Sequence, residues 1–408
     1  MTKKSDAPAI RFKGFSDAWE QRKLGDMMNV TSVKRIHQSD WTDSGVRFLR
    51  ARDIVAAAKN EEPDDYLYIS KEKYEEYSAL SGKVGVSDLL VTGVGTIGVP
   101  YLVRNLEPLY FKDGNIIWFQ NSSRIDGKFL FYSFSAEQIQ GFINESAGIG
   151  TVGTYTIESG KKTPISLPNQ IEQARVGEFF QQLDNLITLH QRKFEKLTNV
   201  KKSMLEKMFP QNGSSYPEIR FKGFTDPWEQ RKAKELFVST ADKGYPELPV
   251  LSATQDRGMI RRDENSINIF HDKKNEAGYK RVLPGQFVIH LRSFQGGFAH
   301  SAIEGITSPA YTVFGFSEPE KHDSEYWKYV FTSKSFIRRL ETVTYGIRDG
   351  RSISYEEFLT LGFVYPSKAE QTAIARYLDK LSDLITLHQR ELEKLQNIKK
   401  SMLEKMFV

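Results

Sequence analysis

The chain has 408 residues, of which 39% are hydrophobic and 27% charged, so two or three folded domains are expected and wholesale disorder is excluded. Its 57 basic and 52 acidic side chains leave a net charge of +5, which also excludes a strongly acidic or histone-like protein. There is no cysteine, so disulfides, thiolate metal sites and a cysteine nucleophile are ruled out.

The remaining composition predicts a soluble cytoplasmic protein without a metal site. The seven histidines are scattered, and none has the spacing of a zinc site. The N-terminal segment has no apolar run that resembles a signal peptide. The longest nearly uncharged stretch, residues 89–103, is too short for a membrane span and is broken by glycines and a proline.

A front box opens the chain and returns later. Residues 10–23 read IRFKGFSDAWEQRK and residues 219–232 read IRFKGFTDPWEQRK, with 12 of 14 positions identical. A tail box returns as well: residues 183–209 and 381–407 share 21 of 27 positions. Upstream of each tail the pattern P-x3-E-Q also recurs, at Pro168 and Pro366. The chain is therefore two copies of one plan.

The stretch between the first front box and its tail is expected to be rich in strands. Runs at 88–92, 101–103 and 115–119 have β-forming residues, and an aromatic helical stretch follows at 128–142. GVGTIG at 93–98 and GIGTVG at 148–153 imitate a dinucleotide-binding loop. Neither is followed by a helical sequence, so glycine turns between strands are the preferred interpretation.

The tails are predicted to be long helices. Neither tail contains glycine or proline, and apolar positions step by four and then three with two polar breaks per copy. A helix of 27 residues is about 40 Å long, close to one turn of B-DNA at about 34 Å. Two such helices would pair antiparallel along this seam, with the histidines as polar register markers. The seam residues are Leu183, Ile187, His190, Phe194, Leu197, Met204 and Met208 in the first copy, and Leu381, Ile385, His388, Leu392, Leu395, Met402 and Met406 in the second.

The second copy repeats the same order. The turn-rich segment 210–217 joins the copies, and block two has β-rich runs at 285–292 and 310–314 around a glycine turn, then an aromatic helical stretch at 326–340. The fold expected is α+β, with two globular regions and two long antiparallel helices in a pseudo-two-fold repeat. The boundaries expected are a globular region at 1–180, a helix at 181–209, a linker at 210–218, a globular region at 219–378 and a helix at 379–408.

Candidate DNA-contacting residues follow from the divergent blocks. Arginine commonly reads guanine, and asparagine or glutamine reads adenine, so polar side chains at strand turns are candidates. Each of them also fits an ordinary surface residue. The candidates are Thr92, Thr96, Arg104 and Lys112 in block one, and Arg257, Arg261, Arg262, Lys280, Arg292, Ser293 and Gln295 in block two.

With its repeated front box, T-x-x-G-T-I-G turn, P-x3-E-Q and L-I-x-L-H-Q-R tail, the chain resembles the specificity subunit of type I restriction-modification systems. The resemblance covers the whole chain. It implies two target recognition domains, each reading one half of a bipartite DNA sequence in a prokaryotic cytoplasm. The helices would set the gap between the halves and dock two modification subunits.

The resemblance also implies where the chemistry would take place. Modification subunits would bind S-adenosylmethionine and methylate adenine at N6, and two restriction subunits would use ATP and Mg²⁺. This chain would hold no cofactor and no catalytic residue. Two alternatives stay open, a stand-alone duplicated DNA-modifying enzyme and a structural coiled-coil adaptor. The lack of N-P-P-Y or D-P-P-Y counts against the first, and two unlike blocks on one scaffold count against the second.

A change in helix length tests whether the helices set the gap. Inserting four residues into the first tail lengthens the helix by about 6 Å. The spacer tolerated between the two half-sites should then change by about two base pairs, as DNA rises about 3.4 Å per base pair. Methylation mapping on targets of graded spacing measures this, and an unchanged spacer would exclude the helix as the ruler.

Overall fold

The structure, a computed structural model, describes residues 7–121, 123–147, 153–211, 214–254, 257–264, 273–290, 297–343 and 354–408. The chain divides into two units: Met1–Arg192 with His388–Val408 form unit 1, and Lys193–Leu387 form unit 2. Each unit thus holds one globular part and a segment of both long helices. The boundary therefore differs from the linear domains expected, because each helix belongs to both units.

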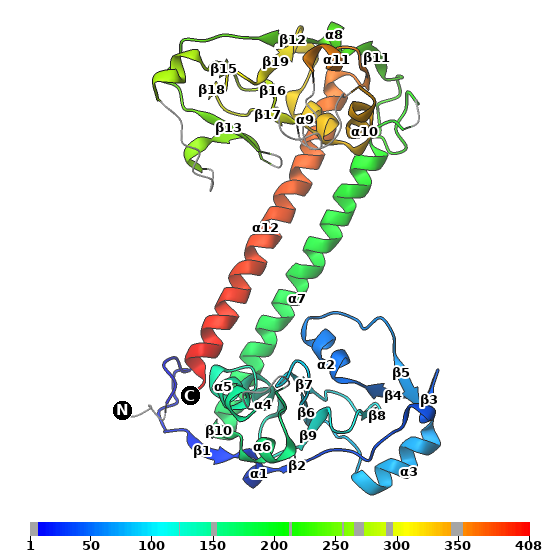
Figure 1. The fold of residues 1–408 in the computed structure, drawn as a ribbon, viewed down its shortest axis with the longest axis vertical. Coiled ribbons are helices and arrows are strands. Elements are labelled where there is room, and N and C mark those ends of the chain that lie inside the picture. Colours follow the sequence, from blue (N-terminus) through cyan, green and yellow to red (C-terminus); the bar gives the residue numbers. More distant parts are fainter. Residues whose placement is uncertain are drawn as a thin grey trace. The chain divides into compact units, whose positions relative to one another are not determined.

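Unit 1 is a mixed α and β structure (Figure 1). Its strands are β1 (Glu20–Lys23), β2 (Asn29–Thr31), β3 (Trp41–Thr42), β4 (Val46–Leu49), β5 (Leu67–Ile69), β6 (Leu89–Thr92), β7 (Pro100–Leu102), β8 (Leu109–Phe111), β9 (Ile116–Gln120) and β10 (Pro164–Leu167). Its helices are α1 (Leu24–Met27), α2 (Ala51–Ala58), α3 (Lys71–Ser81), α4 (Gly127–Ser133), α5 (Glu137–Ser146), α6 (Ile157–Lys162) and the first part of α7 (Gln170–Lys207).

Two four-stranded sheets form most of the globular part of unit 1. The order β2-β9-β6-β7 is antiparallel throughout, and the order β3-β5-β4-β8 contains one parallel pair, β4 with β8. The strands predicted at 88–92, 101–103 and 115–119 are confirmed as β6, β7 and β9. The helical stretch predicted at 128–142 is two helices, since Ala136 has an extended backbone (ψ 150°) between α4 and α5.

Unit 2 repeats this plan with different details. Its strands are β11 (Glu229–Lys232), β12 (Phe237–Thr240), β13 (Leu251–Thr254), β14 (Gly258–Arg261), β15 (Lys280–Val282), β16 (Phe287–Ile289), β17 (Phe298–His300), β18 (Gly305–Thr307), β19 (Thr312–Phe316) and β20 (Gly362–Tyr365). Its helices are α8 (Ala233–Leu236), α9 (Ser324–Thr332), α10 (Lys334–Val343), α11 (Tyr355–Phe358) and the first part of α12 (Lys368–Met406).

The shared elements of the two units have the same connections. The antiparallel sheet β12-β19-β16-β17 of unit 2 corresponds to β2-β9-β6-β7 of unit 1. Each front box also supplies one strand that pairs with the strand before the long helix, β1 with β10 and β11 with β20. The α+β class and the internal repeat expected from the sequence are therefore confirmed.

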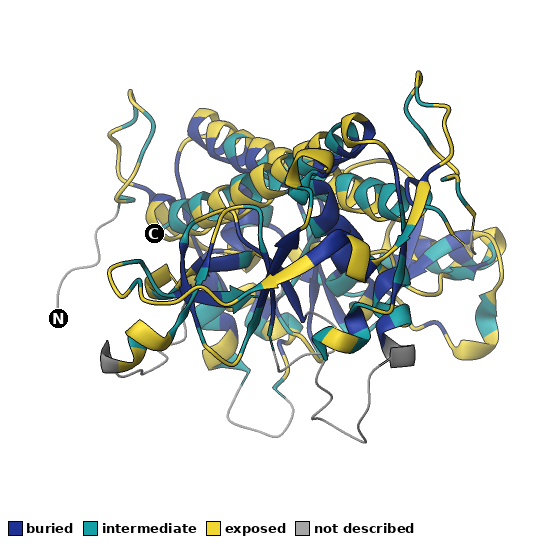
Figure 2. Ribbon diagram, turned by 90° about the horizontal axis from the view of Figure 1, so that it is seen from above, coloured by how far each residue is buried: buried dark blue, intermediate teal, exposed yellow. Residues whose placement is uncertain are grey.

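The long helices begin earlier than the sequence indicated. α7 starts at Gln170 rather than at residue 181, and α12 starts at Lys368 rather than at residue 379. The predicted starts followed the stretch that is identical between the copies. A helix needs only helix-compatible residues, and the first turns of the two helices differ in sequence. In Figure 2 the long helices are mostly exposed or half-buried. Within the described part of the chain, no helix is apolar enough over a sufficient length to cross a membrane.

Within each unit the two helix segments run antiparallel. In unit 1, Asp184 of α7 bonds Lys399 of α12 at 2.6 Å, and two turns later His190 contacts His388 at 3.1 Å. The order along α12 is thus the reverse of that along α7. Met406 and Phe407 at the end of α12 pack into the core of unit 1 beside Phe129. A globular core therefore includes the end of the helix that started in the other unit.

Unit 2 is closed in the same way by the end of α7. Met208 is 2% exposed and Phe209 is 6% exposed, and the Phe209 ring stacks on Tyr326 at 5.5 Å. The repeated ending M-F of each tail is thus a pair of core residues. The first part of α12 contributes Ile374, Ala375 and Leu378 to the same core.

A buried ion pair explains why the front box and P-x3-E-Q recur together. The guanidinium of Arg11 donates to both carboxylate oxygens of Glu172 at 2.6 and 2.7 Å, and Arg220 does the same to Glu370 at 2.7 Å. The two glutamate side chains are 0% and 1% exposed. Because a lone buried carboxylate is costly, each pair ties its front box to the first turn of a long helix.

The glutamine of the same pattern connects the helix to the globular part. Gln173 donates to the Pro168 carbonyl at 2.8 Å and accepts from the backbone N–H of Asp126 at 3.0 Å. Gln371 makes the equivalent bonds to Pro366 and Asp323 at 2.8 and 2.9 Å. Both aspartates cap a helix of the globular part, α4 and α9.

Breaking one arginine–glutamate pair should strongly destabilise the protein. We expect Arg220→Met to lower the free energy of unfolding by about 3–5 kcal/mol, because the Glu370 carboxylate stays buried without its partner. Chemical denaturation measures the loss, and adding Glu370→Gln should recover part of it. The half-buried Arg231, paired with the exposed Glu229, is the control, and Arg231→Met should cost much less than Arg220→Met. Equal losses in both single variants would contradict the assignment.

Candidate nucleic-acid interface

The glycine turn after β6 is built by Thr92. Its hydroxyl donates to the Thr96 carbonyl at 2.6 Å and accepts from the Val99 N–H at 2.9 Å. Gly95 and Gly98 have positive φ, at 74° and 77°. GVGTIG is therefore a turn between strands, as expected, while GIGTVG at 148–153 lies almost wholly outside the described residues.

The block-one candidates therefore differ in what they can contact. Thr92 is 0% exposed and its hydroxyl is hydrogen-bonded within the turn, so Thr92 is not available to contact DNA. Thr96 at the tip of the turn is exposed, as is Arg104 after β7. Lys112 is half-buried beyond the end of β8. The surface positions of Thr96 and Arg104 are compatible with DNA contact.

The block-two candidates are spread over several elements. Arg292, Ser293 and Gln295 lie outside the described residues. Arg257 and Arg261 are exposed at the two ends of β14, and Arg262 next to them is half-buried. Among the described residues, no partner accepts a hydrogen bond from Nε or Nη1 of Arg262. The β13–β14 hairpin thus presents three arginines on one short segment.

Lys280 has a structural role instead. Its ammonium donates to the Tyr311 carbonyl at 2.6 Å, and burial together with the nearby Lys243 lowers its pKa from the ordinary value. Lys280 is therefore a poor candidate for a base contact. Arg281, its neighbour, lies over the Tyr245 ring at 4.4 Å and pairs with Glu304.

Each unit has an open groove beside its long helices. In unit 1 a groove of 640 Å³ is bordered by the loop after β7, α2, α7 and α12, and it includes Arg104 and Lys399. In unit 2 a groove of 690 Å³ includes Arg257 and Lys201. The structure thus brings one predicted arginine of each copy to a groove. Each groove also holds the lysine that the two tails share, Lys399 in unit 1 and Lys201 in unit 2, and this combination suits contact with phosphate.

The predicted seam matches the buried side of the helices. All its members in both copies are buried or half-buried. The rings of His190 and His388 lie 5.1 Å apart, with Nδ1 to Nδ1 at 3.1 Å. A single hydrogen bond between two such nitrogens needs one donor and one acceptor, so the histidines match each other only in this register.

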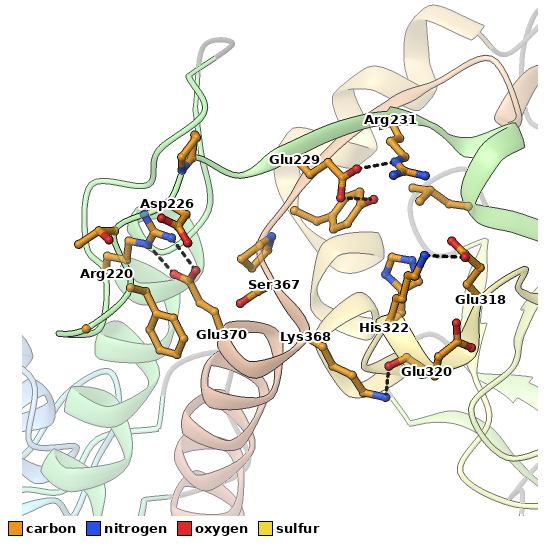
Figure 3. A pocket seen from close by; sticks show the side chains of 18 residues that line it. Arg220, Asp226, Glu229, Arg231, Glu318, Glu320, His322, Ser367, Lys368 and Glu370 are labelled. Carbon is orange, nitrogen blue, oxygen red and sulfur yellow. Dashed lines mark hydrogen bonds and ion pairs between the residues drawn. The ribbon is translucent and has the colours of Figure 1, made fainter.

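The sequence did not predict the role of one buried histidine, His322. His322 precedes α9 and is 6% exposed, stacked on Phe316 at 4.7 Å and edge-on to Tyr365 at 5.2 Å. It borders a cavity of 520 Å³ that is formed by the second front box, β20 and the start of α12 (Figure 3). Burial lowers the pKa of His322 from its ordinary 6.5. No sequence pattern predicts a histidine there, because the equivalent residue in unit 1, directly before the helix-capping Asp126, is Ile125.

The cavity around His322 is lined by charges that mostly neutralise one another. Figure 3 shows Arg220 with Glu370 and Arg231 with Glu229, while Lys321 pairs with Glu318 at 2.6 Å. Lys368 donates to the backbone carbonyl of Glu320 at 2.8 Å. Within the described ranges, no three side chains of histidine, aspartate or glutamate gather closely enough to hold a metal ion.

Comparison with known proteins agrees with this geometry. Residues 16–199 match the family model described as the type I restriction modification DNA specificity domain. This match covers less than half of the chain. The matched stretch lies within the first copy of the repeat.

Two curated relatives and one solved structure have this description. The chain is 26% identical over 46% of its length to the type I restriction enzyme MjaVIII specificity subunit of Methanocaldococcus jannaschii. It is 30% identical over 41% of its length to S.HindORF215P of Haemophilus influenzae, assigned as a type I restriction enzyme specificity subunit. The matches span 44% and 41% of those relatives, which is less than half of their length.

The solved structure is that of a type I restriction-modification system S subunit from M. genitalium. It has a TM-score of 0.60 and 12% sequence identity, and the alignment covers 98% of this chain and 99% of that chain. At this identity the likeness concerns the fold, which the two proteins share.

The buried His322 should make unfolding depend on pH. Because its folded pKa lies below the unfolded value of 6.5, the unfolded chain binds the proton more tightly, so stability is complete above pH 6.5 and falls as the pH decreases below it. The contribution of one such group is at most about 1.4 kcal/mol per pH unit.

Replacing the histidine by the residue of the other copy tests this. His322→Ile should reduce the fall in the free energy of unfolding between pH 7 and pH 5, measured by urea denaturation. The exposed His37 is the control, and His37→Ala should leave the slope unchanged. A slope that does not change in His322→Ile would contradict the prediction.

Proposed function

We propose that this chain is the DNA sequence-specificity subunit of a type I restriction-modification complex. The single observation that carries the proposal is a duplicated scaffold that presents two unlike surfaces. The Arg–Glu pairs, the glutamine links and the helix ends are the same in both copies. The globular surfaces differ, with an arginine-bearing hairpin in unit 2.

Each globular part would act as a target recognition domain for one half of a bipartite DNA sequence. Support comes from the exposed Thr96 and Arg104 in unit 1 and from Arg257 and Arg261 in unit 2. Arginine on a hairpin can enter the major groove and bind guanine through two hydrogen bonds. The positive side chains in the two grooves would contribute phosphate contacts, which position the domain without reading sequence.

The long helices would set the spacer and dock the two modification subunits. The repeated L-I-T-L-H run leaves apolar side chains in solvent, since Leu186, Leu189 and Leu387 are 43%, 45% and 51% exposed. Exposed leucines on a helix that is otherwise well packed are typical of a surface that a partner covers. Two restriction subunits would complete the assembly.

The chain itself would have no catalytic role. Adenine N6 methylation with S-adenosylmethionine would take place in the modification subunits, and ATP- and Mg²⁺-dependent translocation and cleavage in the restriction subunits. The family whose model matches residues 16–199 is described by DNA specificity rather than by catalysis. The competing proposal of a stand-alone enzyme requires that the purified chain alone modifies or cuts DNA, and the adaptor proposal requires no sequence-dependent binding even with partners.

An exchange of block two tests the proposal directly. Replacing residues 233–366 by the corresponding block of another family member should change one half of the methylated sequence and leave the other half unchanged. The reason is that the front boxes and long helices, which hold both copies, are retained. Methylation mapping in a host that carries the modification subunit gives both halves at once. A change in both halves, or in neither, would exclude independent recognition domains.

A further inference from the structure

A tyrosine, an aspartate and a lysine link three helices in unit 1. Tyr132 on α4 is 0% exposed, and its hydroxyl donates to Oδ2 of Asp184 on α7 at 2.7 Å. The other oxygen of Asp184 pairs with the ammonium of Lys399 on α12 at 2.6 Å. That ammonium also lies 5.6 Å from the centre of the Tyr132 ring. One carboxylate therefore joins the globular part to both long helices.

Unit 2 has the same connection with the acid at a different place. Tyr329 on α9 donates to Oδ1 of Asp379 on α12 at 2.6 Å and contacts Ser382 at 3.3 Å. Lys201 on α7 lies 5.7 Å from the centre of the Tyr329 ring. The cation that pairs with Asp379 is Lys328, also on α9, at 2.9 Å. The three elements joined are again a globular helix and both long helices.

The repeat fixes which residues correspond. Each tyrosine stands six residues after the aspartate that caps its helix, Asp126 before Tyr132 and Asp323 before Tyr329. Lys201 and Lys399 are the same position of the tail. The tail position of Asp184 is Ser382 in the other copy, and the position of Asp379 is Gln181. The tyrosine and lysine are thus shared, and the acid has moved by one helical turn.

Chemistry explains why the acid can move. The phenol of a buried tyrosine needs an acceptor, and a half-buried lysine needs an anion nearby. Residues one turn apart lie on the same face of a helix, so either position reaches the tyrosine hydroxyl, and the carboxylate pairs with Lys399 in unit 1 and with Lys328 in unit 2. Burial and the neighbouring Asp184 raise the pKa of Tyr132, so its phenol remains a hydrogen-bond donor. Two different sequences therefore satisfy one structural requirement.

The location of these links suggests their purpose. Asp184 and Lys399 border the 640 Å³ groove of unit 1, and Lys201, Tyr329 and Asp379 border the 690 Å³ groove of unit 2. Hydrophobic contact is non-directional, whereas a charged hydrogen bond has a preferred geometry. The links are thus suited to fix the angle between the globular part and the helix pair more narrowly than apolar packing does.

We propose that Tyr132–Asp184–Lys399 in unit 1, and Tyr329–Asp379–Lys328 with Lys201 over the tyrosine ring in unit 2, are positioning networks. They hold each recognition domain at a fixed angle to the helix pair and so restrict the spacer length that the subunit accepts. The inference rests on the proposed function, and it concerns spacing rather than sequence. The networks touch neither base nor cofactor. Their loss is expected to widen the accepted spacing and to leave the half-site sequences unchanged.

The test uses the full chain assembled with its modification subunits on DNA targets whose spacer is longer or shorter by one base pair. Tyr132→Phe and Asp184→Ser should raise methylation at the altered spacings relative to the native one by about tenfold, the factor expected for one charged hydrogen bond. The half-site sequences should stay the same. An unchanged spacing profile in both variants would overturn the inference.

The other copy supplies a rescue variant. Asp184→Ser combined with Gln181→Asp places the acid of unit 1 at the position that it has in unit 2, within reach of Tyr132, and it should restore the narrow spacing. The mirror change in unit 2, Asp379→Gln with Ser382→Asp, should likewise retain it, while Asp379→Gln alone should widen it. Failure of the transplanted aspartate to restore the native profile would overturn the equivalence of the two networks.

A destabilised control separates positioning from plain stability. Phe134 is 0% exposed and packs on Phe119 away from the network, so Phe134→Leu weakens the core of unit 1 without touching the link. It should lower total methylation or the melting temperature without widening the spacing. An equal widening in Phe134→Leu would overturn the positioning role. If the wild-type assembly methylated no bipartite site, the proposed function itself would fail.

Discussion

Each globular core of this protein is completed by the end of a helix that begins in the other copy. Phe407 packs on Phe129 in unit 1, and Phe209 stacks on Tyr326 in unit 2. Because these rings fill core positions, neither globular part can reach full packing density without the second long helix. The duplicated layout is therefore a requirement of folding and not only a record of a repeated sequence.

The buried ion pairs complete this constraint at the other end of each helix. Arg11 and Arg220 come from the front boxes, and Glu172 and Glu370 from the first helical turns. Core packing at the helix ends and charged hydrogen bonds at the helix starts together define the scaffold. The globular surfaces can then differ in sequence without loss of the scaffold, which the proposed recognition of two different half-sites would need.

The two copies also show how one physical need can be met in different ways. The buried position before the helix cap is Ile125 in one unit and His322 in the other. The acid that accepts from the buried tyrosine is Asp184 in one unit and Asp379 in the other. In each case the space or the hydrogen-bonding requirement is the same. The copies thus serve as natural substitution controls for one another.

The sequence alone determined the α+β class, the duplication, the seam of the long helices and most strands of block one, because period, identity and β-forming runs are local properties. The tertiary structure decided the rest. Helix starts at 170 and 368, the buried state of Thr92 and the partners of Arg11 and Tyr132 all depend on residues far away in the chain. Burial and long-range hydrogen bonds leave no local pattern, so only the folded chain shows which polar residues build the scaffold and which remain at the surface.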